Sequence, residues 1–221
     1  MTKLIGKVLL LFMIAITLII GMQRDIWGSR QTFQPIKAET DLENDIFGNY
    51  NYFVSFGDYK YIISSKGSIE IRDGTEIRNV GELYNHDEYG DYILTLFYAT
   101  YQGDLILLYN ISNMLSGGGR IIRIKGRTIA KVWEVPIFNI SESVIEDNNV
   151  YVVNPSSVAK LDLDTGKIIW KRDDIKQMVG IEKLEGIKIK SDVIELIYEG
   201  GINGKTKNVV VRLNKFDGKE L

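Results

Sequence analysis

The stretch of this chain that most restricts its fold runs from Asn148 to Lys171 and reads NNVYVVNPSSVAKLDLDTGKIIWK. Its first apolar run is β-branched and aromatic, as suits a pleated strand, and Pro155 then marks a turn because proline donates no ladder hydrogen bond. Strict alternation follows over residues 159–163, and Gly166 can take the positive φ of a tight hairpin turn. The stretch therefore predicts three short antiparallel strands joined by two turns.

Weaker copies of this unit occur before and after it. Thr128 and Trp133 repeat the spacing of Thr165 and Trp170, 37 residues earlier, and Gly218 follows Gly166 by 52 residues. A fainter copy surrounds the Asp73-Gly74 turn. Self-similarity at such periods is typical of propeller blades, while an ordinary antiparallel domain with repeated hairpins remains an alternative.

The rest of the chain from residue 46 onward can be divided into four groups of four strand candidates, and residues 24–45 read as a stalk that is poorly ordered or forms one short helix. We therefore expect an all-β, β-propeller-like array of about four four-stranded antiparallel blades over residues 46–221. The strand candidates are residues 52–56, 59–64, 68–72, 76–80, 92–101, 104–109, 120–125, 128–135, 140–145, 151–153, 158–163, 167–171, 181–189, 193–198, 208–213 and 216–221.

The run LDLDTGKIIW, with Asp162, Thr165, Gly166 and Trp170 at these spacings, resembles the repeat of the PQQ-type (quinoprotein-like) β-propeller family. That family's pattern is Ala-x-Asp-x-x-Thr-Gly-x-x-x-Trp, and Lys160 stands where the pattern has alanine. The resemblance implies four-stranded blades in which each tryptophan docks against the neighbouring blade. It also extends to the barrel-assembly lipoproteins of the family, which implies a scaffold without a cofactor.

Residues 1–23 read as a targeting segment. Lys3 and Lys7 precede thirteen uncharged, mostly apolar residues over 8–20, a length between that of a signal h-region and a membrane span. The sequence Ile19-Ile20-Gly21 offers no small-x-small cleavage site. We expect an uncleaved signal anchor, one N-terminal transmembrane helix whose N-terminus is cytoplasmic because the lysines precede it; cleavage stays open, and a buried core helix is the alternative.

Composition excludes several classes of function. The chain has no cysteine, one histidine and a formal net charge of −2, so thiolate chemistry and histidine-based zinc sites or triads are not expected. Near-neutral charge gives no reason to expect nucleic acid as a partner.

Three local patterns could carry chemistry, and each has a simpler explanation. The glycine run in Ser116–Arg120 lacks the rest of a P-loop. The acidic loop of Asn85, His86, Asp87, Glu88 and Asp91 matches no EF-hand. Asp162 and Asp164 flank a turn, where carboxylates are usually turn formers. We expect no catalytic residue, no metal site and no cofactor, and therefore no enzyme.

The remaining feature is a set of aromatic clusters, which could bind sugars or a protein. We expect a membrane-anchored, extracytoplasmic binding or scaffold protein with an unidentified protein partner, and self-association is one way to complete the propeller. A cell-wall or carbohydrate-binding module is the alternative; a quinone-dependent dehydrogenase fragment is disfavoured, because that family's enzymes are larger and many carry vicinal cysteines. The clusters comprise Tyr50, Tyr52, Phe53, Phe56, Tyr59 and Tyr61, and Tyr84, Tyr89, Tyr92, Tyr98 and Tyr101.

Overall fold

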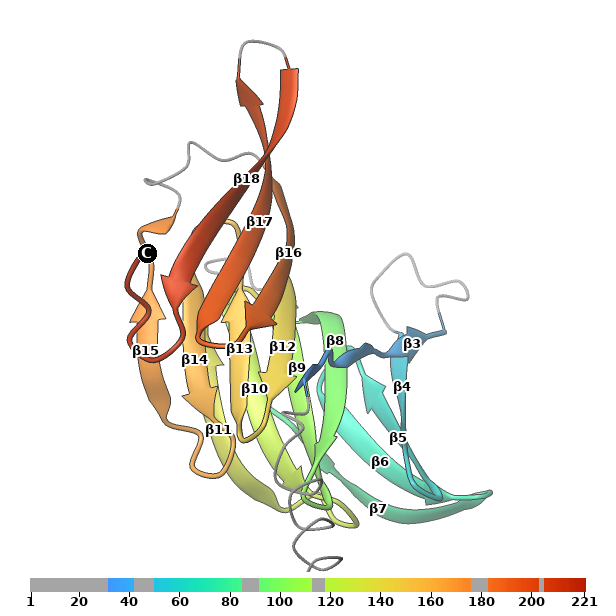
Figure 1. Ribbon diagram of the computed structural model, residues 1–221. Coiled ribbons are helices and arrows are strands. Elements are labelled where there is room, and N and C mark those ends of the chain that lie inside the picture. The colour runs from blue at the N-terminus through green and yellow to red at the C-terminus, as the bar shows by residue number, and fades with distance from the viewer. Residues whose placement is uncertain (1–31, 42–49, 85–91, 113–117, 176–182, 203–204) are drawn as a thin grey trace, which may run out of the picture. The chain divides into compact units, whose positions relative to one another are not determined.

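The computed structural model describes residues 32–41, 50–84, 92–112, 118–175, 183–202 and 205–221 (Figure 1). The eighteen named elements of these ranges, β1 to β18, are all β-strands, which confirms the all-β fold class. No helix in the described ranges is long and apolar enough to cross a bilayer. The transmembrane helix expected over residues 1–23 lies outside these ranges.

Four antiparallel sheets follow one another along the chain, and we call them blades 1 to 4. Blade 1 contains β3 (Glu39–Thr40), β4 (Asn51–Phe56), β5 (Tyr59–Ser64), β6 (Ser68–Asp73) and β7 (Glu76–Glu82). Blade 2 contains β2 (Ile36–Lys37), β8 (Tyr92–Tyr101), β9 (Asp104–Ser112), β10 (Gly118–Lys125) and β11 (Lys131–Ile137). Blade 3 contains β1 (Thr32–Phe33), β12 (Glu142–Glu146), β13 (Asn149–Val153), β14 (Val158–Asp162) and β15 (Ile168–Arg172). Blade 4 contains β16 (Lys183–Lys190), β17 (Val193–Ile202) and β18 (Lys205–Asn214).

Most strand candidates lie where the sequence placed them, with two differences. The strand β11 begins at Lys131 and not at Thr128, because Thr128 belongs to the preceding turn and donates its backbone N–H to Lys125 O at 3.1 Å. The strand expected over residues 216–221 is reduced to one bridge between Glu220 and Leu213, since the turn that follows β18 closes only at Lys219.

Three apolar clusters join consecutive blades. Alternate residues of β9 serve two of them: Leu105, Leu107 and Tyr109 pack toward blade 1, whereas Ile106 and Leu108 pack toward blade 3. A third cluster joins blade 3 to Ile194, Leu196 and Tyr198 of β17, among others. The inner strands β9, β13 and β14 of the middle blades are therefore buried on both faces, which explains the continuous apolar run of β9. Consecutive antiparallel sheets that pack face to face are the arrangement of blades in a β-propeller.

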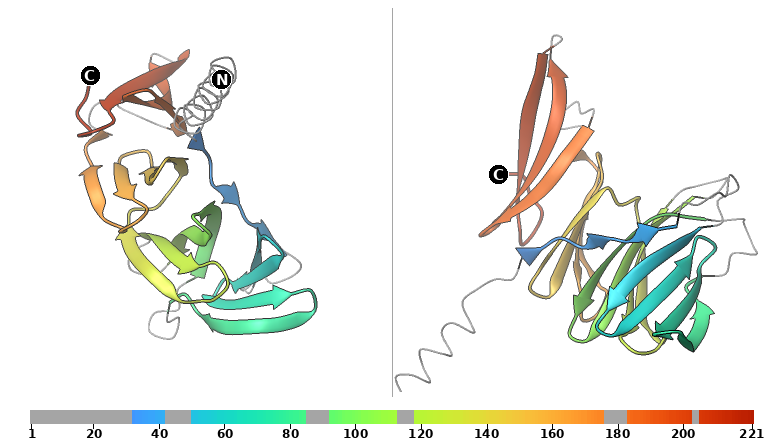
Figure 2. Two further views of the ribbon diagram at one scale, coloured as in Figure 1. Left: turned by 60° about the horizontal axis from the view of Figure 1, so that its bottom comes forward. Right: turned by 90° about the vertical axis from the view of Figure 1, so that its right-hand side faces the viewer.

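A short N-terminal segment, Thr32–Thr40, adds one strand to each of three blades, and we call it the strap. Running backward through the blades, β1 pairs with β12, β2 with β8 and β3 with β4; the blue strands in Figure 2 trace it across the three sheets. Pro35 lies between β1 and β2, where no ladder donor is needed. The structure differs here from the sequence expectation of a poorly ordered stretch or a short helix.

The strap is also fixed by its own packing. Ala38 lies in the cluster between blades 1 and 2, is 4% exposed and donates its N–H to Leu96 O at 2.9 Å. At the strap's end the two carboxylate oxygens of Asp41 accept hydrogen bonds from the backbone and side chain of Asn51, at 2.6 and 3.1 Å. These bonds hold the pKa of Asp41 below its ordinary value.

We expect Ala38→Pro to destabilise the protein by about 1–3 kcal/mol, because it removes the donor that satisfies a buried carbonyl. Ile36→Ser is the control, since Ile36 belongs to the same strap but is 58% exposed, and its effect should stay within about 0.5 kcal/mol. Urea unfolding followed by tryptophan fluorescence measures both. An unchanged midpoint for Ala38→Pro would contradict a structural role for the strap.

Candidate functional site

The two repeat tryptophans occupy equivalent places between blades. Trp133 of β11 donates its indole N–H to Leu163 O of blade 3 at 3.1 Å. Trp170 of β15 donates in the same way to Lys215 O of blade 4 at 3.2 Å. Each indole also lies against a turn glycine, because a Cβ on Gly166 would lie 2.7 Å from the Trp133 ring and one on Gly218 would lie 2.8 Å from the Trp170 ring.

A cation also reaches each of the two acceptor carbonyls. Arg123 stands opposite Trp133 across the β10–β11 ladder, and Lys160 stands opposite Trp170 across the β14–β15 ladder. Arg123 Nη1 donates to Leu163 O at 3.0 Å, and Lys160 Nζ donates to Lys215 O at 3.4 Å. Each carbonyl thus accepts an indole N–H and a cationic N–H from the preceding blade, and Lys160 performs a role that the alanine of the family pattern could not.

The interface between blades 1 and 2 uses the equivalent carbonyl with different chemistry. Gly126 O, 37 residues before Leu163 O, accepts a hydrogen bond from the Tyr61 hydroxyl. Ile129 stands where Gly166 stands in blade 3, and it faces a glycine and not a tryptophan: a Cβ on Gly81 would lie 3.1 Å from Ile129 Cδ1. At this interface the earlier blade supplies the glycine, Gly81, and the turn of the later blade supplies the large side chain, Ile129, which is the reverse of Trp133 and Gly166. The space between the two blades is therefore still filled.

The remaining repeat residues shape the turns that present these carbonyls. Asp162 Oδ1 accepts hydrogen bonds from Thr165 N and Thr165 Oγ1, both at 2.8 Å, while Thr128 Oγ1 accepts one from Ala130 N at 3.2 Å. Gly166 and Gly218 both have φ of 71°, a left-handed conformation that glycine adopts without strain. The repeat pattern therefore encodes a hairpin turn that holds a carbonyl toward the previous blade.

Two buried charge clusters lie beside these contacts. Arg123 is paired with Asp104 at 2.7 Å, and Lys215 is paired with Glu146 at 2.7 Å. Lys160 is a second buried cation, and it lies next to the Lys215–Glu146 pair. The interface between blades 3 and 4 therefore contains two buried lysines and one buried carboxylate. Burial first, and then the charge of Lys215, hold the pKa of Lys160 below its ordinary value.

The tyrosine clusters are largely used for packing between blades. Tyr52 and Tyr61 are buried, and the hydroxyls of Tyr50 and Tyr52 both donate to Ile93 O of blade 2, at 2.5 and 3.0 Å. Tyr101 of blade 2 donates to Asp164 Oδ1 of blade 3 at 2.9 Å. Burial raises the pKa of Tyr101 to about 12, and the hydrogen bond to Asp164 adds to this. These four tyrosines are thus engaged in contacts between blades.

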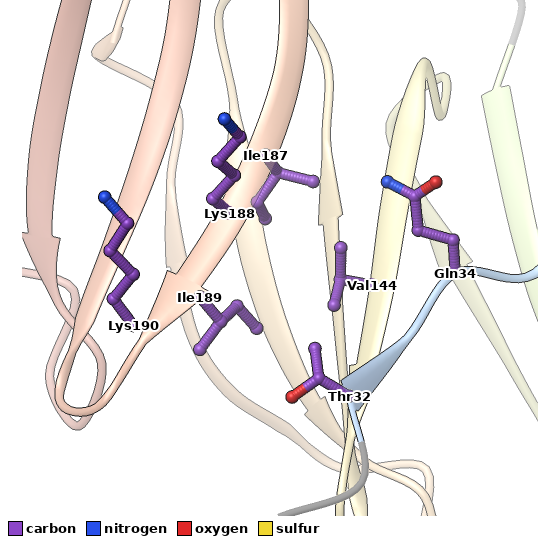
Figure 3. A pocket seen from close by; sticks show the side chains of 7 residues that line it. All are labelled: Thr32, Gln34, Val144, Ile187, Lys188, Ile189 and Lys190. Carbon is purple, nitrogen blue, oxygen red and sulfur yellow. The ribbon is translucent and has the colours of Figure 1, made fainter.

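The best candidate for a binding site is a pocket of about 300 Å³ beside β16. Figure 3 shows Ile187 and Ile189 of β16 turned toward Val144 of β12, with Thr32 and Gln34 of the strap segment on the near side. Lys188 and Lys190 form the other margin. The pocket thus has an apolar floor and a basic edge.

The strand β16 has an unpaired edge at this pocket. It is the first strand of its blade, and its only strand partner among the described residues is β17. The corresponding first strands β4, β8 and β12 each carry a strand of the strap. The edge of β16 that faces the pocket therefore corresponds to the edges of β4, β8 and β12 that the strap covers in the other three blades.

The sequence did not single out these pocket residues. The sequence predicted a strand over residues 181–189 and gave it no binding role, although lysines on a strand are typical of an edge. No local pattern shows that an edge stays uncovered, because this depends on where the strap ends.

No described residue of the patterns weighed for chemistry lines this pocket. The acidic loop of residues 85–91 lies outside the described residues, as do Ser116 and Gly117, while Gly118, Gly119 and Arg120 begin β10. Asp162 caps a turn and Asp164 accepts a tyrosine hydroxyl. No group of three or more acidic or histidine side chains suited to a metal ion occurs among the residues that the structure describes.

Comparisons with known proteins give structural similarity alone. No protein-family model and no curated protein matches the sequence. A europium-containing methanol dehydrogenase is similar over 76% of this chain at 11% identity, with a TM-score of 0.46. BamB from Moraxella catarrhalis is similar over 85% of this chain and 78% of its own, at 13% identity and a TM-score of 0.30. The chain spans 40% of the dehydrogenase's length.

Glycine substitutions test the tryptophan contacts. Gly166→Ala combines strain at positive φ with a collision against the Trp133 ring, whereas Gly74, with φ of 60°, has nothing within 4 Å of an added Cβ. Gly74→Ala should cost about 1 kcal/mol, and Gly166→Ala roughly 1–3 kcal/mol more because of overpacking. Chemical denaturation of the two variants measures the difference, and equal losses would contradict docking of Trp133 on Gly166.

The two cations should respond differently to removal. Arg123→Met should cost about 3 kcal/mol, because it leaves Asp104 buried without its closest cation. Lys160→Met should be neutral or stabilising, since it removes the surplus cation and leaves the Lys215–Glu146 pair intact. Both are read from thermal and urea unfolding, and a large loss of stability in Lys160→Met would contradict this account.

Proposed function

We propose that the protein is a membrane-anchored, extracytoplasmic scaffold that acts by binding another protein and has no catalytic site of its own. The observation that carries the binding role is the pocket at the edge of β16 that has no strand partner among the described residues, with its apolar floor and basic margin. Apolar pockets with a few polar groups are the usual sites of recognition.

The anchoring part of the proposal rests on the sequence. Lys3 and Lys7 precede a long apolar run that lacks a small-residue cleavage site. A retained run of that kind would fix the N-terminus in the cytoplasm and the blades outside it. The short distance from residue 23 to the strap at Thr32 would keep the blades near the membrane, where a membrane-bound partner is met.

The non-catalytic part rests on how the polar side chains are used. Asp104 and Glu146 are held by buried cations, and Asp162 is held by a turn. These carboxylates therefore serve as structural partners of buried cations or of a turn, which supports a structural use of them over a catalytic one. A quinone-dependent dehydrogenase fragment and a carbohydrate-binding module are the rivals.

The test is affinity capture of the full-length protein, tagged at its C-terminus, from detergent-solubilised native membranes. We expect a stoichiometric protein partner, an intact mass that retains residues 1–23, and resistance of the membrane-bound protein to carbonate extraction. A cleaved mass would contradict the anchor. Quinone absorbance retained after the cofactor is added, or binding to peptidoglycan without a protein partner, would favour one of the rivals instead.

A further inference from the structure

We propose that β16 is a strand-addition site, at which an extended segment of the partner protein pairs with the free edge and places acidic residues beside Lys188. This inference rests on the proposed binding role and names its site and the chemistry of its ligand. It starts from the strap, which shows that the first strands of these blades accept added strands: β4, β8 and β12 each pair with a strand only two residues long.

The free edge supplies the backbone part of this recognition. An edge strand presents a row of N–H and C=O groups that a second extended chain can pair with. In the described part of the chain β16 pairs through one side only, with β17. An added strand on the other side would give blade 4 the same four-strand width that blades 1 to 3 have without the strap.

Side chains of an added strand would alternate between two environments. Those on the side of blade 3 would enter the pocket, whose floor is formed by Val144, Ile187 and Ile189. Apolar residues fit there, because Ile187 already belongs to the core between blades 3 and 4. Those on the opposite side would lie next to the lysines.

The opposite face of blade 4 carries a charge ladder that determines the preferred sign. Lys188 pairs across the sheet with Glu195, which pairs with Arg212, and Arg212 Nε lies 3.1 Å from Glu195 Oε1. The ladder reads positive, negative, positive, so an acidic residue opposite Lys188 would continue it. A second copy of β16 would set lysine against lysine, which disfavours self-pairing.

The predicted ligand is therefore an extended segment in which apolar and acidic residues alternate. A probe is an eight-residue peptide of alternating valine and glutamate, labelled with fluorescein, and its charge-reversed counterpart contains lysine in place of glutamate. Fluorescence anisotropy with the full-length protein in detergent should show binding of the glutamate peptide, weakened by salt, and at least tenfold weaker binding of the lysine peptide.

Two peptides methylated on backbone nitrogens distinguish strand addition from plain attraction between charges. Methylation of every second nitrogen blocks one edge of the peptide, and methylation of the alternate set blocks the other edge. One of the two peptides should lose binding and the other should keep it. Equal binding of both would overturn strand addition, as would no binding of the unmodified peptide at millimolar concentration.

Matched protein variants locate the site. Lys188→Glu should weaken the glutamate peptide at least tenfold and strengthen the lysine peptide. Lys183→Glu makes the same charge change on the same strand, at an exposed lysine that does not line the pocket, and should change either affinity less than twofold. Equal effects of the two substitutions would overturn the site.

The same variants separate this inference from the proposed binding role. A membrane partner captured by the wild type and lost by Lys188→Glu supports both. A partner captured equally well by the two proteins leaves the scaffold role standing and overturns the site at β16. Failure of the wild type to capture any partner overturns the scaffold role, whatever the peptides do.

Discussion

The structure depends on one repeated contact, in which a backbone carbonyl at a hairpin turn accepts a side-chain donor from the preceding blade. Leu163 O and Lys215 O each accept an indole and a cation, and Gly126 O accepts a tyrosine hydroxyl. A buried carbonyl without a partner is costly, so each contact both satisfies a polar group and fixes the distance between blades. The position of the acceptor is constant, whereas the chemistry of the donor varies, which lets the copies diverge in sequence while the packing persists.

The two outermost faces of the array have a different character from the interfaces between blades. On blade 4, Glu195 lies between Lys190 and Arg212, at 2.7 and 3.1 Å. On blade 1, Arg72 is paired with Glu70 at 2.8 Å, and Lys60 lies over the Phe53 ring, 4.4 Å from its centroid. Exposed apolar side chains lie among these charges, because Val80 pairs with Glu70 and is 63% exposed, and Val210 pairs with Ile197 and is 41% exposed. Both faces are therefore mixed in character, unlike the apolar interfaces between blades.

Long strands with a regular pattern could be predicted from the sequence, and contacts between distant segments could not. The bounds of β8, Tyr92–Tyr101, were predicted correctly because a run of ten residues, seven of them aromatic or β-branched, lies between clear turn signals. The strap was missed because strands of two residues carry no periodicity. The Tyr61–Gly126 contact was missed for another reason: its donor lies on a different strand from the tryptophans, so no repeat spacing points to it. The pocket beside β16 depends on which edges the strap covers, and that is decided by tertiary structure.

The strap also affects how the array of blades unfolds. Repeats that touch only their neighbours unfold almost independently, so that a weak end blade can be lost while the others persist. Here β1 pairs with blade 3, whereas β3, seven residues later in the chain, pairs with blade 1. Unfolding of blade 1 therefore frees part of the strap, which also forms the edge strands of blades 2 and 3. This shared segment couples the first three blades into one cooperative unit.

During synthesis the strap emerges before all of its partners and can finish pairing only after β12 has formed, so closure of this unit comes late in folding. Blade 4 lies beyond the strap's described reach and is the blade most free to open on its own.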